Sequence, residues 1–428
     1  MVNNPYLCKN FASMRVLLIN TSEQTGGAAI ACNRLMEALK KQGIRAKMLV
    51  RDKQTDKLTV ISVKSSWKLP IMFLWERICI FVAHRFSKKN LFQMDIANVG
   101  TDVTVMKEFQ RADVIHLHWV NQGFLSMKTI ERIMQCGKPV VITMHDMWYF
   151  TGICHYSADC EKYKSACEHC PLLGSEKALI DYAKRVFEQK RRLYSQSKVT
   201  FVGCSEWIAS LARQSALTQG QRVVSIPNAI DMTVFRKLDK SELRARHHVD
   251  PDKKLLLFGA QRITDERKGF RYLAEACKLI EQHTPELAKK IEIMVVGGDS
   301  GKVQNLLPFA VRPVGYVNKQ QQMVELYNMV DIYVTPSLQD NLPNTIVEAM
   351  ACGIPCVGFN VGGIPEMIDH KKSGYVAEYQ SAEDFARGIE WVLTADYGQL
   401  SEAACRKAAG TYSEEAVAKK YMEVYGNA

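Results

Sequence analysis

The sequence lacks any hydrophobic run long enough to cross a bilayer. Its longest apolar stretch, Leu69 to Ala83, is about half to three-quarters of a membrane span and contains Glu76 and Arg77. The N-terminal segment, Met1 to Ser13, has no continuous apolar core and therefore predicts no secretory signal. Both absences predict a cytoplasmic protein, with peripheral contact at the inner face of the plasma membrane as the only membrane association left open.

Several nucleotide-binding signatures are also missing. No complete G-x-G-x-x-G spacing accompanies the glycine pair Gly26-Gly27, which argues against an NAD-dependent dehydrogenase. The segment from Gly297 to Val303 superficially suggests a P-loop, but its first glycine is misplaced and no Ser or Thr follows Lys302. Without an arginine-rich arm or an aromatic-basic motif, a nucleic-acid partner is not expected.

The length and composition of the sequence predict a soluble globular chain of two domains. The 428 residues exceed one ordinary core, and 47% hydrophobic with 24% charged residues is typical of folded proteins. The 56 Lys and Arg outnumber the 45 Asp and Glu, giving a net charge of +11. Such a balance favours an anionic partner, such as a nucleotide sugar, a lipid diphosphate or a membrane surface.

Short β-branched runs alternate with helical periods, which predicts an α/β fold of two doubly wound, Rossmann-like domains. We predict residues 1–230 as an N-terminal Rossmann-like domain and 231–412 as a C-terminal one, with helix 413–428 packing back on the first. The expected strands are 15–20, 46–50, 113–118, 139–144, 199–203 and 223–226, then 254–259, 291–296, 331–335 and 355–359. If the two domains face each other across a cleft, ligands bind there, at the carboxyl ends of the strands.

The sequence predicts the ends or the apolar face of three helices. The first is expected from Gly27 to Gln42 with Gly43 as its stop, and the last begins after Ser413 as N-cap. Residues 67–86 predict an amphipathic helix that either lies on a membrane or packs its apolar face into the core.

The clearest local feature runs from Ser337 to Met350, directly after a predicted strand. Asn344 is a candidate N-cap, so the amides of the next turn would face an anion. Asp340 and Glu348 are separated by seven residues and could grip different hydroxyls of one ligand. Spacing alone leaves an ordinary capped helix equally possible.

This stretch resembles the E-x7-E signature of family 4 retaining glycosyltransferases, which have the two-domain GT-B fold. The segments Met350 to Pro355 and Val361 to Glu366 are similar to that family too. The sequence departs at the first acid, where Asp340 replaces the usual Glu. The resemblance implies that Glu348 holds the ribose hydroxyls of a nucleotide sugar, and that the loop faces the transferred sugar and the diphosphate through Asp340, Asn341, Leu342, Pro343, Asn344 and Thr345.

Two cations follow the predicted strand at 254–259. In isolation Arg262 and Lys268 would be solvated surface charges. The family places an arginine and a lysine at this spacing, which implies that they neutralise the departing diphosphate. In the family a glycine pair at Gly26 and Gly27 lies near the donor phosphates.

Three histidines lie at strand ends: His116, His118 and His145. A single strand-end histidine is more often structural, although several in one place favour a site. The family pattern has a histidine at the position of His145, near the reacting sugar, so we favour it over His118.

Cys154, Cys160, Cys167 and Cys170 form C-x5-C-x6-C-x2-C. A structural zinc site and reduced thiols are equally supported by this spacing, and disulfides are less favoured in a reducing compartment.

The resemblance implies a metal-independent retaining glycosyltransferase that needs no cofactor and uses a nucleotide-diphosphate sugar as co-substrate. It also implies that residues 1–230 form the acceptor-side domain and residues 231–412 the nucleotide-sugar-binding domain. A glycan or lipid-linked acceptor in cell-surface polysaccharide synthesis is expected. The alternative is a non-catalytic sugar-nucleotide-binding or scaffold protein, which the substitution at Asp340 keeps open. A phosphorylase of the same fold would need a pyridoxal phosphate lysine.

Overall fold

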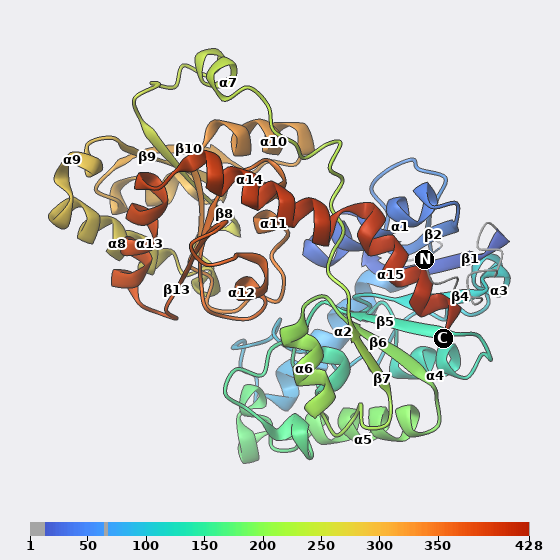
Figure 1. The fold of residues 1–428 in the computed structure, drawn as a ribbon. Coiled ribbons are helices and arrows are strands. Elements are labelled where there is room, and N and C mark those ends of the chain that lie inside the picture. The colour runs from blue at the N-terminus through green and yellow to red at the C-terminus, as the bar shows by residue number, and fades with distance from the viewer. Residues whose placement is uncertain (1–12, 64–66, 428) are drawn as a thin grey trace. The chain divides into compact units, whose positions relative to one another are not determined.

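The computed structural model describes residues 13–63 and 67–427 (Figure 1). Most of the N-terminal segment, for which no secretory signal is expected, lies outside the described residues. The chain divides into two compact units, which are described separately below. Unit 1 comprises Met1–Ala229 and Val417–Ala428, and unit 2 comprises Ile230–Ala416.

Unit 1 is built on a seven-stranded parallel sheet with the order β3-β2-β1-β4-β5-β6-β7. Its strands are β1 Arg15–Ser22, β2 Arg45–Asp52, β3 Val60–Ser62, β4 Val114–Leu117, β5 Val140–Met144, β6 Val199–Gly203 and β7 Arg222–Ser225. Its helices are α1 Gly27–Lys41, α2 Lys68–Ala83, α3 Lys107–Arg111, α4 Met127–Met134, α5 Tyr182–Ser195, α6 Glu206–Gln214 and α15 Glu414–Gly426, the last of which begins in unit 2. The strand order reverses between β1 and β4, where doubly wound sheets bind ligands.

Both faces of this sheet are buried, which explains why its strands are continuous apolar runs. Along β1, Leu17 and Ile19 belong to one core cluster while Val16 and Leu18 belong to the cluster on the opposite face. The first helix ends as expected, with Gln42 as C-cap and Gly43 at a φ of 85°.

The last helix, α15, covers part of the second face. Its residues Val417, Tyr421 and Tyr425 are buried in the same cluster as Val16 and Leu18. The predicted N-cap is present, since Ser413 Oγ accepts a hydrogen bond from the Ala416 amide at 3.4 Å.

Two tyrosine hydroxyls of α15 reach the sheet. The Tyr425 hydroxyl lies 2.8 Å from His116 Nδ1, and the Tyr421 hydroxyl lies 2.8 Å from Thr143 Oγ1. Thr143 Oγ1 is in turn 2.7 Å from His116 Nε2. Burial, with a smaller contribution from His145, lowers the pKa of His116 to about 3, so the ring is neutral. His116 is therefore a structural residue, as a strand-end histidine usually is.

We expect Tyr425→Phe to destabilise unit 1 by about 1–3 kcal/mol, because it leaves a buried ring nitrogen of His116 without its partner. Amide hydrogen exchange of β4 and β5 measures this change. A control, Tyr156→Phe, alters a hydroxyl on a half-buried residue away from α15. Unchanged exchange in Tyr425→Phe would show that the hydroxyl pair contributes nothing to stability.

Unit 2 has a six-stranded parallel sheet with the order β10-β9-β8-β11-β12-β13. Its strands are β8 Lys254–Arg262, β9 Ile291–Gly298, β10 Ala310–Gly315, β11 Ile332–Thr335, β12 Cys356–Phe359 and β13 Gly374–Ala377. Its helices are α7 Lys240–Arg246, α8 Phe270–His283, α9 Pro285–Ala288, α10 Gln320–Met329, α11 Asn344–Ala351, α12 Ile364–Met367, α13 Ala382–Thr394 and α14 Tyr397–Lys407. The strand order reverses between β8 and β11, so the segments after these two strands lie together.

Within residues 13–63 and 67–427, no helix combines the length and apolar character that crossing a membrane requires.

Candidate active site

The candidate site in unit 2 is assembled from the turn after β8 and the loop after β11. Gly269 follows a short 3-10 turn, Glu266–Lys268, and has a φ of 68°. A Cβ at this position would lie 1.8 Å from the Pro336 carbonyl oxygen, so only glycine permits this approach. The Leu338 amide also donates to the Arg267 carbonyl at 2.7 Å. The backbone therefore fixes the two segments against each other.

This packing brings two of the predicted site residues into contact. Lys268 Nζ lies 2.7 Å from Asp340 Oδ2, and both side chains are partly accessible, at 30% and 16%. An ammonium and a carboxylate at this spacing present one positive and one negative group side by side. The cation is thus held in a fixed position by the acid that departs from the family pattern.

Arg262 is the last residue of β8 and is exposed. Its carbonyl accepts a hydrogen bond from the Asp265 amide at 3.2 Å, so it belongs to the same turn as Lys268. As the sequence predicts, both cations lie at the carboxyl end of the sheet: Arg262 ends β8 and Lys268 follows it.

The helix after the loop begins one residue earlier than expected. Asn344 is the first residue of α11 and not its N-cap, which is Pro343, and no side chain caps this helix. Pro343 has an extended ψ of 116°, which ends the loop before the helix starts. The first turn of α11, which includes Asn344 and Thr345, contains no acidic side chain. Its backbone amides therefore still suit an anion.

Glu348 is buried at 7% exposure on α11. Its Oε2 accepts a hydrogen bond from the Tyr327 hydroxyl at 2.9 Å. Burial, together with the charge of Glu348, raises the pKa of Tyr327 well above its usual value, so this hydroxyl stays a donor. Sequence reasoning missed Tyr327, which lies on α10 and gives no signal there beyond an aromatic residue in an apolar helix.

The loop between β11 and α11 is also held from its far side. Gly362 has a φ of 59°, and a Cβ there would lie 1.7 Å from the Asp340 carbonyl oxygen. The Gly363 amide donates to the Asn341 carbonyl at 2.8 Å. Asn341, Leu342 and Pro343 are buried within this arrangement. The resembling segment at 361–366 thus supports the loop directly.

In unit 1, Gly26 and Gly27 lie where the sequence places them, between β1 and α1. Gly26 is exposed, has a φ of 92°, and would find no heavy atom within 4 Å of an added Cβ. Backbone at this place is therefore open to a ligand at the start of a helix.

His145 follows β5 and is bound at both ring nitrogens. Its Nε2 lies 2.9 Å from His118 Nδ1, and its Nδ1 lies 3.4 Å from Cys204 Sγ. Burial lowers the pKa of His145 to about 4, against a smaller opposing effect of Asp146. The imidazole is neutral at pH 7, so a sugar hydroxyl would compete with His118 for Nε2.

Asp146, the next residue, ties several segments together. Its carboxylate accepts hydrogen bonds from Trp119 Nε1 at 2.9 Å and from the Trp148 amide at 2.9 Å. It also lies 2.7 Å from His155 Nδ1, while Asp95 Oδ2 lies 2.6 Å from His155 Nε2. One imidazole is therefore clamped between two carboxylates beside His145.

This clamp keeps His155 charged. Burial by itself would lower the pKa of His155, but Asp146 and Asp95 outweigh it and raise the pKa to about 10. Asp95 also pairs with the buried Arg77 of α2, next to the buried Glu76. Sequence reasoning missed this pair, because Asp95 lies sixty residues from His155 in the chain.

The four clustered cysteines are present as thiols. Burial raises the pKa of Cys154 well above its usual value and that of Cys167 to about 11. Cys167 Sγ accepts a hydrogen bond from the Gly152 amide at 3.3 Å. No group of three or more His, Cys, Asp or Glu in the described part of the chain is arranged to hold a metal ion. The zinc site stays a prediction without a ligand geometry.

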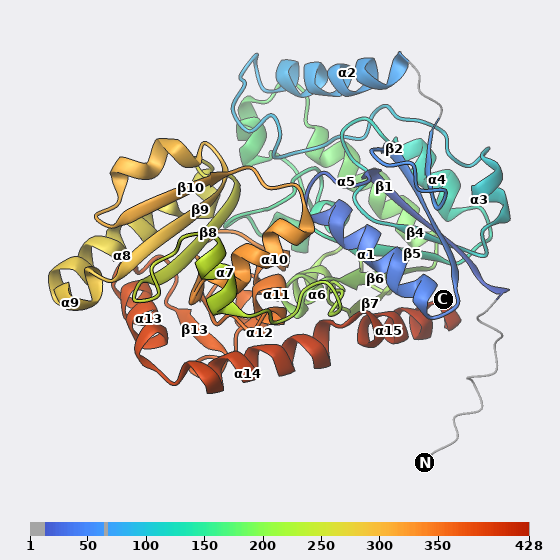
Figure 2. The same cartoon turned by 90° about the horizontal axis from the view of Figure 1, so that it is seen from above.

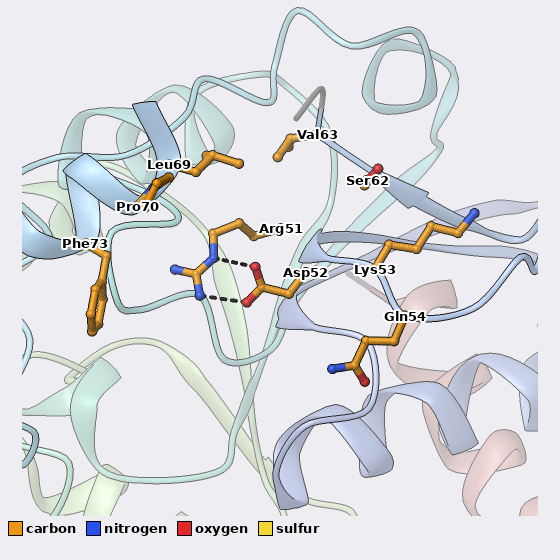
Figure 3. Close-up of a pocket in the computed structure, with 9 residues that line it drawn as sticks. All are labelled: Arg51, Asp52, Lys53, Gln54, Ser62, Val63, Leu69, Pro70 and Phe73. Atoms are coloured by element: carbon orange, nitrogen blue, oxygen red, sulfur yellow. Dashed lines mark hydrogen bonds and ion pairs between the residues drawn. The ribbon is translucent and has the colours of Figure 1, made fainter. Parts of the chain in front are cut away.

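A cavity of about 650 Å³ lies in unit 1 beyond the ends of β2 and β3. Figure 3 shows Leu69, Pro70 and Phe73 of α2 on one side of it and the segment after β2 on the other, with the Arg51–Asp52 ion pair between them. The two guanidinium contacts to Asp52 measure 2.9 and 2.7 Å. The cavity therefore has one apolar wall and one polar wall.

Both units match families of known proteins. The family described as "Glycosyltransferase Family 4" matches residues 25–234, and the family described as "Glycosyl transferases group 1" matches residues 252–395. The putative colanic acid biosynthesis glycosyl transferase WcaC of Escherichia coli K12 is 25% identical over 335 residues, which span 73% of this chain and 76% of WcaC.

Solved structures show the same fold. Sucrose-phosphate synthase from Thermosynechococcus elongatus has a TM-score of 0.67 at 19% identity, over 97% of this chain and 98% of its own. HepE from Anabaena, solved in complex with UDP and glucose, has a TM-score of 0.61 at 15% identity, over 97% of this chain and 100% of its own. The two parallel-sheet units thus form the GT-B fold.

With these matches on both units, the chain belongs to glycosyltransferase family 4.

Proposed function

We propose that this glycosyltransferase moves a sugar from a nucleotide-diphosphate donor to a glycan or lipid-linked acceptor with retention at the anomeric carbon, and that it serves cell-surface polysaccharide synthesis. The main support for a nucleotide-diphosphate donor is the contact of Lys268 with Asp340, in the loop that leads into α11. A fixed cation and a helix N-terminus together suit a diphosphate.

The reaction we propose needs no general base of its own. The anomeric bond to the diphosphate breaks, and its electron pair leaves with the phosphate oxygen. The acceptor hydroxyl forms the new bond on the same face and passes its proton to that departing oxygen. Lys268 and Arg262 would stabilise the charge that builds on the diphosphate.

Glu348 is the residue we propose for the nucleoside. Its buried carboxylate accepts a hydrogen bond from the Tyr327 hydroxyl, which orients it, and a carboxylate suits the ribose hydroxyls of the donor. In unit 1, the cavity beside α2 is our candidate for the acceptor, because its polar and apolar walls suit a glycan attached to a lipid.

Metal independence is the first testable consequence. Because side chains and helix amides replace a divalent ion in this scheme, we expect transfer activity to stay within about twofold when a chelator is added. The assay measures product from a radiolabelled donor with and without EDTA. Strict dependence on Mg²⁺ would contradict the scheme.

Donor turnover distinguishes an enzyme from the alternative, a non-catalytic sugar-nucleotide-binding or scaffold protein. A scaffold protein would bind the donor without hydrolysing or transferring it. No observation on this chain favours that alternative over an enzyme.

A further inference from the structure

Helix α2 exposes most of its large apolar side chains and buries the charged pair at its centre, Glu76 and Arg77. Glu76 is fully buried and Arg77 is 4% exposed, and both point into unit 1 with Ile80 and Ala83. The large side chains of the opposite side, which we call the α2 apolar face, are exposed: Trp67 at 73%, Ile71 at 51%, Leu74 at 56%, Trp75 at 52% and Ile78 at 41%. This is the reverse of a helix that packs on a core and faces water.

The spacing of these residues places them on one side. Relative to Trp67 they follow at i+4, i+7, i+8 and i+11, which is a single stripe of an α-helix. Figure 2 shows α2 along the outside of its unit. The stripe is therefore a continuous apolar surface, of the kind that marks an interaction site.

The buried charges hold this face outward. Arg77 pairs with Asp95 and donates to the Met94 carbonyl at 3.0 Å. Glu76 Oε1 accepts hydrogen bonds from the Ile96 and Ala97 amides at 2.9 and 2.7 Å. Rolling the helix to hide its apolar face would leave buried charges unpaired, which costs several kcal/mol and keeps the exposed arrangement in place. The exposure is thus specified by the ion pairs on the other side.

The charges around the face have one sign. Between Trp67 and Phe92 the single acidic residue is the buried Glu76. The exposed charged residues of that range are all basic: Lys68, Arg85, Lys88 and Lys89. Phe86 and Phe92 are interleaved with them, at 64% and 63% exposure. The partner of this surface must therefore be apolar and bear negative charge.

We propose that the α2 apolar face docks on an anionic lipid bilayer, with its tryptophans at the level of the headgroups and the flanking lysines and arginine against lipid phosphates. Amphipathic helices with this combination lie in the plane of the interface, and tryptophan is enriched there. A second copy of the chain fits less well, because a symmetric pair would bring two like-charged rims together. This inference does not depend on the proposed function.

Vesicle flotation of the full chain tests the proposal. We expect wild-type protein to float with equimolar phosphatidylglycerol and phosphatidylcholine vesicles, and much less with phosphatidylcholine alone. The double variant Leu74→Glu/Trp75→Glu should bind at least about tenfold more weakly, because it places two charges in the interface. Val105→Glu, which alters an even more exposed apolar residue elsewhere in unit 1, should bind as wild type does.

A second variant addresses the charges. Lys88→Gln/Lys89→Gln should weaken binding to the anionic vesicles by at least about tenfold and reduce its salt dependence, because each basic side chain near such a surface contributes about 1 kcal/mol. Both substituted pairs are exposed, so the fold should persist, which circular dichroism checks.

Failure of wild type to float with the anionic vesicles would overturn the proposal, as would undiminished binding of the Leu74→Glu/Trp75→Glu variant. A dimer in sedimentation velocity that this variant dissolves, without vesicle binding by wild type, would assign the face to a second copy instead. Donor hydrolysis without vesicles, measured on the same preparations, reports on the active site alone. Loss of flotation with hydrolysis intact therefore concerns only the docking face.

Discussion

Replacing Lys268 with alanine is expected to lower the turnover of sugar transfer about 10²–10³-fold, the usual effect of removing one group that stabilises charge in the transition state. The cation contacts Asp340 at 2.7 Å and stands beside the first turn of α11, so nothing in that turn would replace its charge. Initial rates at saturating donor measure the loss, and the KM for the donor shows whether binding changes as well.

A matched control is Lys302→Ala, which removes an exposed lysine of unit 2 that pairs with Asp299. That variant should keep full activity. Asp340→Asn distinguishes two roles of Lys268, holding Asp340 in place and stabilising charge on the diphosphate. If the lysine only holds Asp340 in place, Asp340→Asn will lose as much activity as Lys268→Ala. Activity of Lys268→Ala near the wild-type level would remove the main support for a diphosphate site.

Replacing His155 with alanine is expected to destabilise unit 1 by about 3–5 kcal/mol at pH 7, because it leaves the Asp146 and Asp95 carboxylates buried without their shared cation. Urea unfolding followed by tryptophan fluorescence measures the loss, since Trp119 and Trp148 both donate to Asp146. His84→Ala is the control, because that ring is half-buried and its Nδ1 lies 3.1 Å from the Lys89 carbonyl oxygen.

The effect of His155 should depend on pH in a defined direction. The pKa of this imidazole rises from an ordinary value of 6.5 to about 10 on folding. Its stabilising contribution is therefore complete below pH 6.5 and is lost as the pH rises towards about 10. The difference between wild type and His155→Ala should shrink over that window. A difference that stays constant would show that His155 acts through packing and not through its charge.

The same network connects the docking helix with the site histidine. Arg77 of α2 binds Asp95, Asp95 binds His155, and His155 binds Asp146, the residue after His145. Asp146 in turn fixes the segments that follow β4 and β5 through Trp119 and Trp148. A change in this network would therefore act on the geometry of His145 as well as on stability.

The sequence by itself determined the alternation of strands and helices and the positions of the chemistry in unit 2. Ten strands could be located from the pattern alone. Nine of them lie inside their sheets, where buried parallel strands are continuous apolar runs, and the tenth, β7, is an edge strand with two consecutive valines. The three missed strands, β3, β10 and β13, all lie at sheet edges. Edge strands are short and partly exposed, as with Arg312 and Pro313 in β10, and so lack that pattern.

Contacts between distant segments were decided only by the tertiary structure. The Lys268–Asp340 pair spans 72 residues and the His155–Asp95 pair spans 60, and no periodicity encodes either. The fold sets the ionisation of both histidines, since two carboxylates raise the pKa of His155 and burial lowers that of His145. It also turns α2 so that Glu76 and Arg77 face inward. Such effects arise because the pKa of a side chain and its exposure depend on what the fold places around it, whereas local pattern depends on neighbours along the chain.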